Sequence, residues 1–269
     1  MRFLGIRRQT EFSPNHVMSD RLIFTKTVEA LMRRGVEVVE IDESEAERAD
    51  GHALVFSMAQ GPRASEVLAR IERSQRCLMV NSPQAVMSCY RVNMVRRLPA
   101  ADIPFPRSVI VDTATAAPPV PEFGARKMWV KRGDVHAVHR EDVTLAYRAD
   151  ECVEVLQEFR QRGIAQAVFQ EHIAGDVVKF YAVRGEDFFE WFYLNGGSAS
   201  FDAQRLRELA DASAEVLGLD VYGGDAIVGP QGLVIIDVND WPSFSAVREA
   251  AAEKIASRIV RKALAHVGD

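Results

Sequence analysis

Two apolar runs near the end of the chain, separated by a turn sequence, constrain the fold more than any other feature. The runs span residues 221–228 and 233–238, and Gly229-Pro230-Gln231-Gly232 lies between them. Because β-branched residues favour strands while Gly and Pro mark turns, the pattern predicts an antiparallel hairpin. The second run begins Leu-Val-Ile-Ile, and so few polar interruptions are typical of a buried strand. We therefore expect a buried hairpin in the C-terminal part of the chain.

Three oxygen-bearing side chains are expected to meet on this hairpin. Asp237 and Asn239 lie two residues apart on one strand, so their side chains point to the same face. A turn centred on Gln231 places Asp225 directly opposite Asp237, with Cβ atoms about 4.5–5.5 Å apart. Two carboxylates and an amide suit Mg²⁺, which prefers oxygen ligands and keeps positions for phosphates and water. The alternative is a surface hairpin with solvated polar residues, but an Asp on a buried strand has to be paired or bound to a metal.

The composition argues against several other classes of protein. Of the 269 residues, 48% are hydrophobic and 26% are charged, which is ordinary for a globular protein. The formal net charge of −5 does not suggest a basic surface for nucleic acid. The three cysteines are widely spaced and odd in number, so neither a disulfide framework nor a cysteine zinc site is expected. Neither a signal peptide nor an apolar run of about 20 residues is visible, so we expect a soluble, cytoplasmic protein without membrane or nucleic-acid partners.

The chain changes character near its middle. Its first ninety or so residues alternate short β-branched strands with helices, which predicts parallel βαβ units. One helix is expected from Asp20, as its N-cap, to Arg34, and another from about residue 84 to 98. Residues 113–121, rich in Ala, Thr and Pro, are expected to form a flexible connection at a domain boundary. The second half is expected to be α+β with antiparallel strands.

Residues 234–244 (VIIDVNDWPSF) resemble the metal-binding strand and following loop of ATP-grasp enzymes. The groups that they resemble most are the glutathione synthetase-like ligases, the glutamate ligases that modify ribosomal proteins, and the inositol trisphosphate kinases. Upstream, residues 81–83 (NSP) and 103–106 (IPFP) are similar to the family's passage from its N-terminal domain into the ATP-binding domain.

This resemblance implies an α/β N-terminal domain followed by α+β ATP-grasp domains, whose two lobes sandwich ATP. We place the N-terminal domain at residues 1–95, the central lobe at 96–172 and the C-terminal lobe with the metal site at 173–269. The implied cofactors are ATP and Mg²⁺, with Mn²⁺ as a substitute. In the metal site, the resemblance assigns the same three ligands as the geometry, which are Asp225, Asp237 and Asn239.

The resemblance also assigns three cations to the phosphates. Arg91 falls where the family usually has a Lys on the α-phosphate, and an Arg keeps the charge but not the geometry. Lys131 falls at the second nucleotide lysine, and Lys179 resembles a basic position that contacts phosphate or substrate in the kinase branch. The alternatives are a solvated surface lysine for Lys131 and a sheet-edge lysine for Lys179.

A hinge for the nucleoside is implied between these cations and the metal strand. Gln170, Glu171, His172 and Ile173 resemble the interdomain hinge whose backbone reads the adenine edge. Glu171 and Asp176 would then take the ribose hydroxyls. On its own the motif is weakly specific, and its order after Lys131 and before Asp237 supports it.

The flap over the phosphates departs from the family. Residues 132–139 contain one glycine where many ATP-grasp ligases have several. The flap is therefore expected to be shorter or stiffer, or to close with side chains such as His136 and His139, which could touch phosphate or substrate. The alternatives are a surface hairpin with incidental histidines and, less favoured because a third ligand is lacking nearby, a zinc site.

Two further loops are expected to contact the substrate. After the metal strand, Ser243 stands where the family usually has Gly, and Ser243 and Ser245 can offer hydroxyls to a substrate carboxylate. Trp241 and Phe244 of the same loop could instead fill the core under the last helix. The loop of residues 11–20, which includes Ser19, precedes the first helix and could hold an acidic substrate, because helix N-termini favour anions. The alternative is that it only caps the helix.

Together these assignments imply a ligase that forms an acyl phosphate from a carboxylate and ATP, which an amine or similar nucleophile then attacks. Such catalysis depends on positioning and on neutralising phosphate charge, which agrees with the lack of a Ser-His-Asp or Cys-His signature. The substrates would be small-molecule or peptide carboxylates and amines, and a homodimer is possible because many relatives are dimers. A small-molecule kinase and a non-catalytic nucleotide-binding regulator are the alternatives. The scattered basic residues outside the nucleotide positions favour the ligase over the kinase, and the complete metal-ligand set disfavours the regulator.

Overall fold

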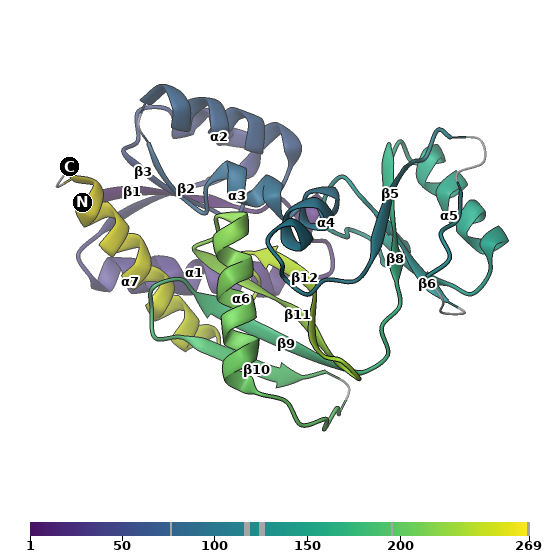
Figure 1. The fold of residues 1–269 in the computed structure, drawn as a ribbon. Coiled ribbons are helices and arrows are strands. Elements are labelled where there is room, and N and C mark those ends of the chain that lie inside the picture. Colours follow the sequence, from purple (N-terminus) through teal and green to yellow (C-terminus); the bar gives the residue numbers. More distant parts are fainter. Residues whose placement is uncertain (76, 116–118, 124–126, 195, 268–269) are drawn as a thin grey trace.

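The structure is a computed structural model, and it describes residues 1–75, 77–115, 119–123, 127–194 and 196–267. These residues form three four-stranded sheets, one in each third of the chain (Figure 1). The first sheet is parallel and the other two are antiparallel. The expected order of an α/β part followed by an α+β part is therefore confirmed.

The parallel sheet has helices on both of its faces. Its strands are β1 (Arg2–Arg7), β2 (Glu37–Asp42), β3 (Leu54–Ser57) and β4 (Leu78–Val80), in the order β2-β1-β3-β4. The helices of this part are α1 (Val17–Arg33) and α2 (Pro62–Gln75), with the short 3₁₀ helices η1 (Thr10–Phe12) and η2 (Glu43–Ala49). Phe3 and Phe56 pack with α1, whereas Leu4 and Val55 pack with α2, because successive side chains of a strand point to opposite faces.

Two helix boundaries in this part differ from those expected. Helix α1 begins at Val17 with His16 as its N-cap, so the expected cap Asp20 lies inside the helix. The Asp20 carboxylate instead accepts a hydrogen bond of 3.0 Å from Arg8.

The single helix expected at residues 84–98 is two helices, α3 (Pro83–Ser88) and α4 (Arg91–Ala100). They are separated by Tyr90, whose backbone is extended, with φ −61° and ψ 136°. The break places Arg91 at the first position of α4.

The second sheet forms a lobe with its own hydrophobic core (Figure 1, teal). Its strands are β5 (Ser108–Asp112), β6 (Met128–Arg132), β7 (Val143–Ala146) and β8 (Gln166–Glu171), in the order β5-β8-β6-β7. Helix α5 (Ala149–Gln161) packs on it, and η3 (Arg140–Asp142) precedes β7. The connection expected at residues 113–121 joins β5 to β6 within this one sheet, so the expectation that it is a domain boundary is wrong. Its residues 116–118 lie outside the described residues.

The third sheet carries the hairpin. Its strands are β9 (Asp176–Val183), β10 (Phe189–Tyr193), β11 (Val221–Gly229) and β12 (Gly232–Asp240), in the order β10-β9-β11-β12. Helix α6 (Ala203–Leu217) packs on one face together with α4, whereas α7 (Arg248–Val267) packs on α1 of the parallel sheet. No helix in the described parts of the chain is long and apolar enough to span a membrane.

The three parts are not equally independent. One continuous core contains α1, the parallel sheet, Tyr181, Trp241, Phe244 and α7, so the first and third parts are packed into a single body. Leu98 and Ile103 also pack with α6 and β9, that is, with the third part. The central lobe has a separate core and is joined to this body near residues 104–107 and 171–176 (Figure 1). The division at residues 1–95, 96–172 and 173–269 stays a prediction.

The hairpin pairs Asp225 with Asp237, as expected, but through a different turn. Its two-residue turn, Pro230-Gln231, lies between the paired Gly229 and Gly232. A regular hairpin on this turn would place Ile236 opposite Asp225. A β-bulge at Ile236 shifts the register by one residue and brings Asp237 opposite Asp225 instead.

Candidate functional site

A cavity of about 330 Å³ lies between the central sheet and the β11–β12 hairpin. We call it the cleft. The chain segment that follows β8 forms one side of it, which is the segment expected to be a hinge. The described residues that line it are Arg91, Pro106, Trp129, Lys131, Val143, Gln170, Glu171, His172, Ile173, Ala174, Gly175, Val177, Asp225, Ile227, Ile236 and Asp237.

The acidic end of the cleft is made by the hairpin. The Nζ atom of Lys179 lies 2.8 Å from Asp225 Oδ1, and the side-chain amide of Asn239 lies 3.5 Å from Asp237 Oδ2. Arg91 Nη1 lies 3.6 Å from Asp237 Oδ1, which is an ion-pair distance but too long for a hydrogen bond. These two buried atoms and Arg91 Nε have no hydrogen-bond partner among the described residues. The acidic end therefore has buried polar atoms that are free to bind a ligand.

The pKa values of the two hairpin carboxylates shift in opposite directions. Burial raises the pKa of Asp225, and this effect outweighs the ion pair with Lys179. Burial also disfavours the charged form of Asp237, but the nearby Arg91 and Lys131 outweigh it and lower its pKa. Lys179 is half-buried, which disfavours its charged form, but the Asp225 carboxylate raises its pKa. Asp237 is thus held as a carboxylate in a half-buried position, where it can bind a hard cation.

The residues present fit a hard cation such as Mg²⁺ rather than a metal that prefers nitrogen or sulfur ligands. No group of three or more His, Cys, Asp or Glu side chains that could hold a metal occurs within the described ranges. The hairpin set has two carboxylates and the amide of Asn239, all of which offer oxygen. Mg²⁺ is usually bound by one or two carboxylates together with phosphates and water, so a set of this size is sufficient.

A buried cation lies on the opposite wall. Lys131 is only 7% exposed, and its ammonium donates a hydrogen bond of 2.6 Å to Gln170 Oε1. Burial, and then the charge of Arg91, lowers the pKa of Lys131 to about 7. None of the described carboxylates forms an ion pair with Lys131. Two cationic groups, Arg91 and Lys131, are therefore held in the cleft without full neutralisation.

Another part of the cleft lining is apolar and aromatic. The rings of Trp129 and His172 stack with centroids 6.2 Å apart, and burial lowers the pKa of His172. Ile173, Ile227 and Ile236 line the same cavity. These apolar and aromatic residues, which we call the apolar slot, line the same cavity as the cationic and acidic groups, and this combination suits a ligand with a flat base and phosphates.

The two acidic residues expected at the ribose behave differently. Glu171 lines the cleft, but its carboxylate accepts two hydrogen bonds of 2.8 Å from Arg107, which lower its pKa. Asp176 is outside the cleft lining, and its carboxylate accepts hydrogen bonds from the backbone amides of Ser198 and Ala199 at 2.7 and 2.8 Å. The Asp176 carboxylate thus holds the loop after β10, and its expected ribose contact stays a prediction.

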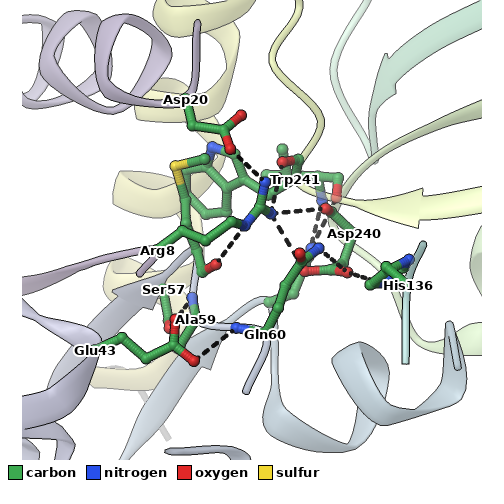
Figure 2. Close-up of polar contacts among 12 residues, drawn as sticks. Arg8, Asp20, Glu43, Ser57, Ala59, Gln60, His136, Asp240 and Trp241 are labelled. Carbon is green, nitrogen blue, oxygen red and sulfur yellow. Dashed lines mark hydrogen bonds and ion pairs between the residues drawn. The ribbon is translucent and has the colours of Figure 1, made fainter. Parts of the chain in front are cut away.

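The flap closes through a side chain. His136 Nε2 lies 2.7 Å from Asp240 Oδ1, at the end of β12 (Figure 2). The single glycine, Gly133, allows close packing rather than flexibility, because a Cβ there would lie 2.8 Å from both Gln166 O and Val92 Cγ1. The Gly133 carbonyl accepts a hydrogen bond of 3.1 Å from the Val92 amide. His136 was expected to touch phosphate or substrate, and it binds the metal-strand end of the protein itself.

Asp240 is the centre of a polar network that we call the junction, formed by Arg8, Asp20, Gln60, His136 and Asp240 (Figure 2). Gln60 donates a hydrogen bond of 3.0 Å to Asp240, and Arg8 donates to the backbone carbonyls of Asp240 and Trp241. Burial disfavours the charged form of Asp240, but the hydrogen bond from His136 and the charge of Arg8 lower its pKa. The junction joins the parallel-sheet part, the flap and the metal strand. Sequence reasoning missed Arg8, Gln60 and Asp240. The one signal that could have pointed to Asp240 is that it directly follows the expected metal ligand Asn239.

A second cavity, of about 530 Å³, lies beside the junction between the end of β1 and the start of α1. Arg7 pairs with Glu40 and Asp42 at 3.0 and 2.9 Å, and Arg8 pairs with Asp20. The cavity therefore presents both signs of charge. Its described lining residues include Arg7, Arg8, Gln9, Thr10, Glu11, Ser13, Asp20, Arg21, Asp42 and Ser44.

The serines expected at the substrate are less central. Ser19 lies on α1 and is not among the residues that line the second cavity, although the loop before α1 is. Ser243 and Ser245 line neither the cleft nor this cavity. Their neighbours Trp241 and Phe244 are fully buried in the shared core, where Trp241 stacks on Phe56. The alternative that these two aromatic residues fill the core is confirmed.

Comparisons with known proteins agree with this architecture. The chain superposes on a D-alanine–D-alanine ligase from Bacillus anthracis in complex with ATP, with a TM-score of 0.74 over 98% of this chain and 97% of that one, at 14% identity. It superposes on an ATP-grasp RimK domain protein from Sphaerobacter thermophilus with a TM-score of 0.69 over 97% of this chain and 100% of that one, at 21% identity. The chain has the ATP-grasp fold. The resemblance found in the sequence is confirmed at the level of the fold.

Sequence comparison is consistent with the ATP-grasp assignment but covers less of the chain. No family model matches. A probable alpha-L-glutamate ligase from Hydrogenovibrio crunogenus is 31% identical over 160 residues, which are 56% of this chain and 52% of that protein. The chain thus spans about half the length of the curated relative that it matches.

Proposed function

We propose that this ATP-grasp chain is an ATP- and Mg²⁺-dependent ligase that joins a carboxylate to an amine. The observation that carries the proposal is the cleft, where two incompletely neutralised cations face a hairpin with two carboxylates and an amide, beside an apolar slot. A nucleotide with its base against Trp129 and His172 would place its phosphates between Lys131 and Asp237. The ligase names printed for the similar proteins support the reaction class.

In this proposal Arg91 and Lys131 bind the phosphates, and Asp225, Asp237 and Asn239 hold Mg²⁺. The bound metal would neutralise the negative charge that shifts onto the leaving group during the transfer. A substrate carboxylate oxygen attacks the γ-phosphorus, ADP leaves, and an amine then displaces phosphate from the acyl phosphate. The chain's own residues position the reactants and balance charge, which is what such transfers need.

The second cavity supports a ligase over a kinase of phosphorylated or polyanionic substrates. Two of its arginines, Arg7 and Arg8, are already paired with Asp20, Glu40 and Asp42. A cavity of mixed charge suits an amino acid or peptide that carries both an ammonium and a carboxylate. We therefore propose that the carboxylate and amine substrates enter beside the junction. A homodimer and a cytoplasmic location stay predictions.

The test is the release of ADP and phosphate from ATP in the presence of Mg²⁺ and pools of amino acids or of polyols, with the product mass measured. A ligase releases ADP and phosphate only with amino acids or peptides and gives a condensed product, whereas a kinase gives a phosphorylated polyol. Turnover with polyols alone would contradict the proposal.

A matched pair of variants tests the metal site. We expect Asp237→Asn to remove Mg²⁺-dependent ATP binding, measured by calorimetry, because it removes a charged oxygen ligand. Asp187→Asn is the control, since Asp187 is 97% exposed and lies on the turn before β10. Equal Mg²⁺-dependent binding by the two variants would rule out the hairpin as the metal site.

A further inference from the structure

The side chain of Gln170 is buried between Lys131 and Ser108. It is 1% exposed, and its Oε1 atom accepts a hydrogen bond of 2.6 Å from Lys131 Nζ. Its Nε2 atom donates a hydrogen bond of 3.2 Å to Ser108 Oγ, and Ser108 lies directly opposite Gln170 on β5. The resemblance gave this residue a backbone contact with adenine, so these side-chain contacts are a separate observation.

The chemistry of this chain of hydrogen bonds fixes the direction of the Gln170 amide. The carbonyl oxygen of Pro106 can only accept, and the Ser108 hydroxyl donates to it at 2.9 Å. Because the single hydroxyl proton of Ser108 is used there, Ser108 Oγ must accept from its other partner. Gln170 therefore turns its NH₂ group to Ser108 and its carbonyl oxygen to Lys131, which can only donate.

A neutral acceptor at this place keeps the charge of Lys131 available. The charged groups that face Lys131 are Arg91 on α4, Asp225 on β11 and Asp237 on β12, and neither carboxylate is within ion-pair distance. A carboxylate in the place of Gln170 would hold the ammonium equally well but cancel its charge. An amide holds it without doing so.

We propose that Gln170 is a positioning residue that aims the Lys131 ammonium at the nucleotide phosphates, with Ser108 fixing the direction of its amide. This inference rests on the proposed binding of ATP in the cleft. Gln170 contacts Lys131, and Ser108 contacts Gln170, so both side chains act through Lys131 and not on the reacting atoms. We therefore expect a defect that is specific for phosphate-bearing ligands.

The test compares dissociation constants for Mg²⁺-ATP and for adenosine by calorimetry. Gln170→Leu keeps the side-chain size but removes both hydrogen bonds, and we expect ATP binding to weaken by roughly tenfold or more, because a hydrogen bond to a charged group is lost. Ser108→Ala frees the amide to rotate, and we expect about threefold weaker ATP binding as part of that bond is lost. Ser108→Thr keeps a hydroxyl on a strand and should restore the affinity. Adenosine should bind all three variants as it binds the wild type.

A merely structural role would give other results. Loss of ATP and adenosine affinity together, or ATP affinity unchanged in both Gln170→Leu and Ser108→Ala, would overturn the inference. If Gln170→Leu does not fold, judged by circular dichroism and Tm, the Ser108→Ala and Ser108→Thr pair decides alone. Failure of the wild type to bind ATP would instead overturn the proposed function on which the inference rests.

Discussion

At the scale of single residues, Lys131 shows how the cleft is prepared for a polyanion. An ammonium that is 7% exposed loses hydration, and its pKa falls to about 7 because of burial and then Arg91. Only a neutral amide, Gln170, compensates for this loss at hydrogen-bond distance. A bound phosphate would supply the missing negative charge and restore the charged form.

We therefore expect ATP binding to take up a proton at Lys131. With a pKa of about 7 in the free protein, Lys131 is mostly neutral at about pH 8, and phosphate raises its pKa, so affinity falls as pH rises above 7. Calorimetry in buffers of different ionisation enthalpy measures the uptake. Lys131→Arg should remove it, because Arg is always charged. Equal proton uptake by the two proteins would contradict this assignment.

The sequence predicts a residue's position where that position follows from the alternation of side chains along a strand, but not where it depends on contacts between distant segments. Asp225, Asp237 and Lys131 lie where pattern and order predicted. Asp176 and Lys179 lie three residues apart on β9, and residues with this spacing on one strand face opposite sides, so the structure does not bring both to one face. The junction could not be predicted from the sequence, because Arg8, Gln60 and His136 come from segments that meet only in the folded chain.

At the scale of elements, the bulge in the β11–β12 hairpin lets one strand place both an apolar and an acidic side chain in the cleft. Ile235 and Val238 face the core, whereas the consecutive residues Ile236 and Asp237 both line the cleft. An extra residue in one strand allows two neighbours to share a face. The bulge thus adds an apolar wall beside the acidic end. The pair 225–237 was predicted correctly from the sequence with the wrong turn, because a two-residue turn together with a one-residue bulge gives the same pairing as a turn centred on Gln231.

Deletion of Ile236 should preserve the metal site and weaken binding of the base. Without the bulge, regular pairing on the Pro230-Gln231 turn still places Asp237 opposite Asp225, and Val238 still faces the core. Loss of an apolar side chain from the cleft costs about 1–2 kcal/mol, or roughly tenfold in ATP affinity. Ile236→Ala, which keeps the bulge, should weaken binding similarly. A deletion variant that loses Mg²⁺ dependence would show that the bulge is needed for the metal register.

At the scale of the whole molecule, the central lobe is the part with the fewest ties to the rest. It has its own core, whereas the other two parts share one. Apart from the two chain crossings, the flap holds it to the body through the Val92–Gly133 backbone bond and the His136–Asp240 contact. Asp240 also accepts a hydrogen bond from Gln60 of the parallel-sheet part. The contact that closes the cleft therefore involves residues of all three parts.

His136→Ala should therefore let the central lobe open in the absence of ligand. The variant removes the only side-chain hydrogen bond or ion pair between flap residues 133–139 and Asp240 among the described residues, while the cores stay intact. We expect a larger radius of gyration by small-angle scattering and faster amide exchange in this segment. His139→Ala is the matched control, because His139 is an exposed histidine of the same loop. If both variants scatter and exchange like the wild type, the lobe is held by the Gly133 backbone and the chain crossings alone, and His136 does not close the cleft.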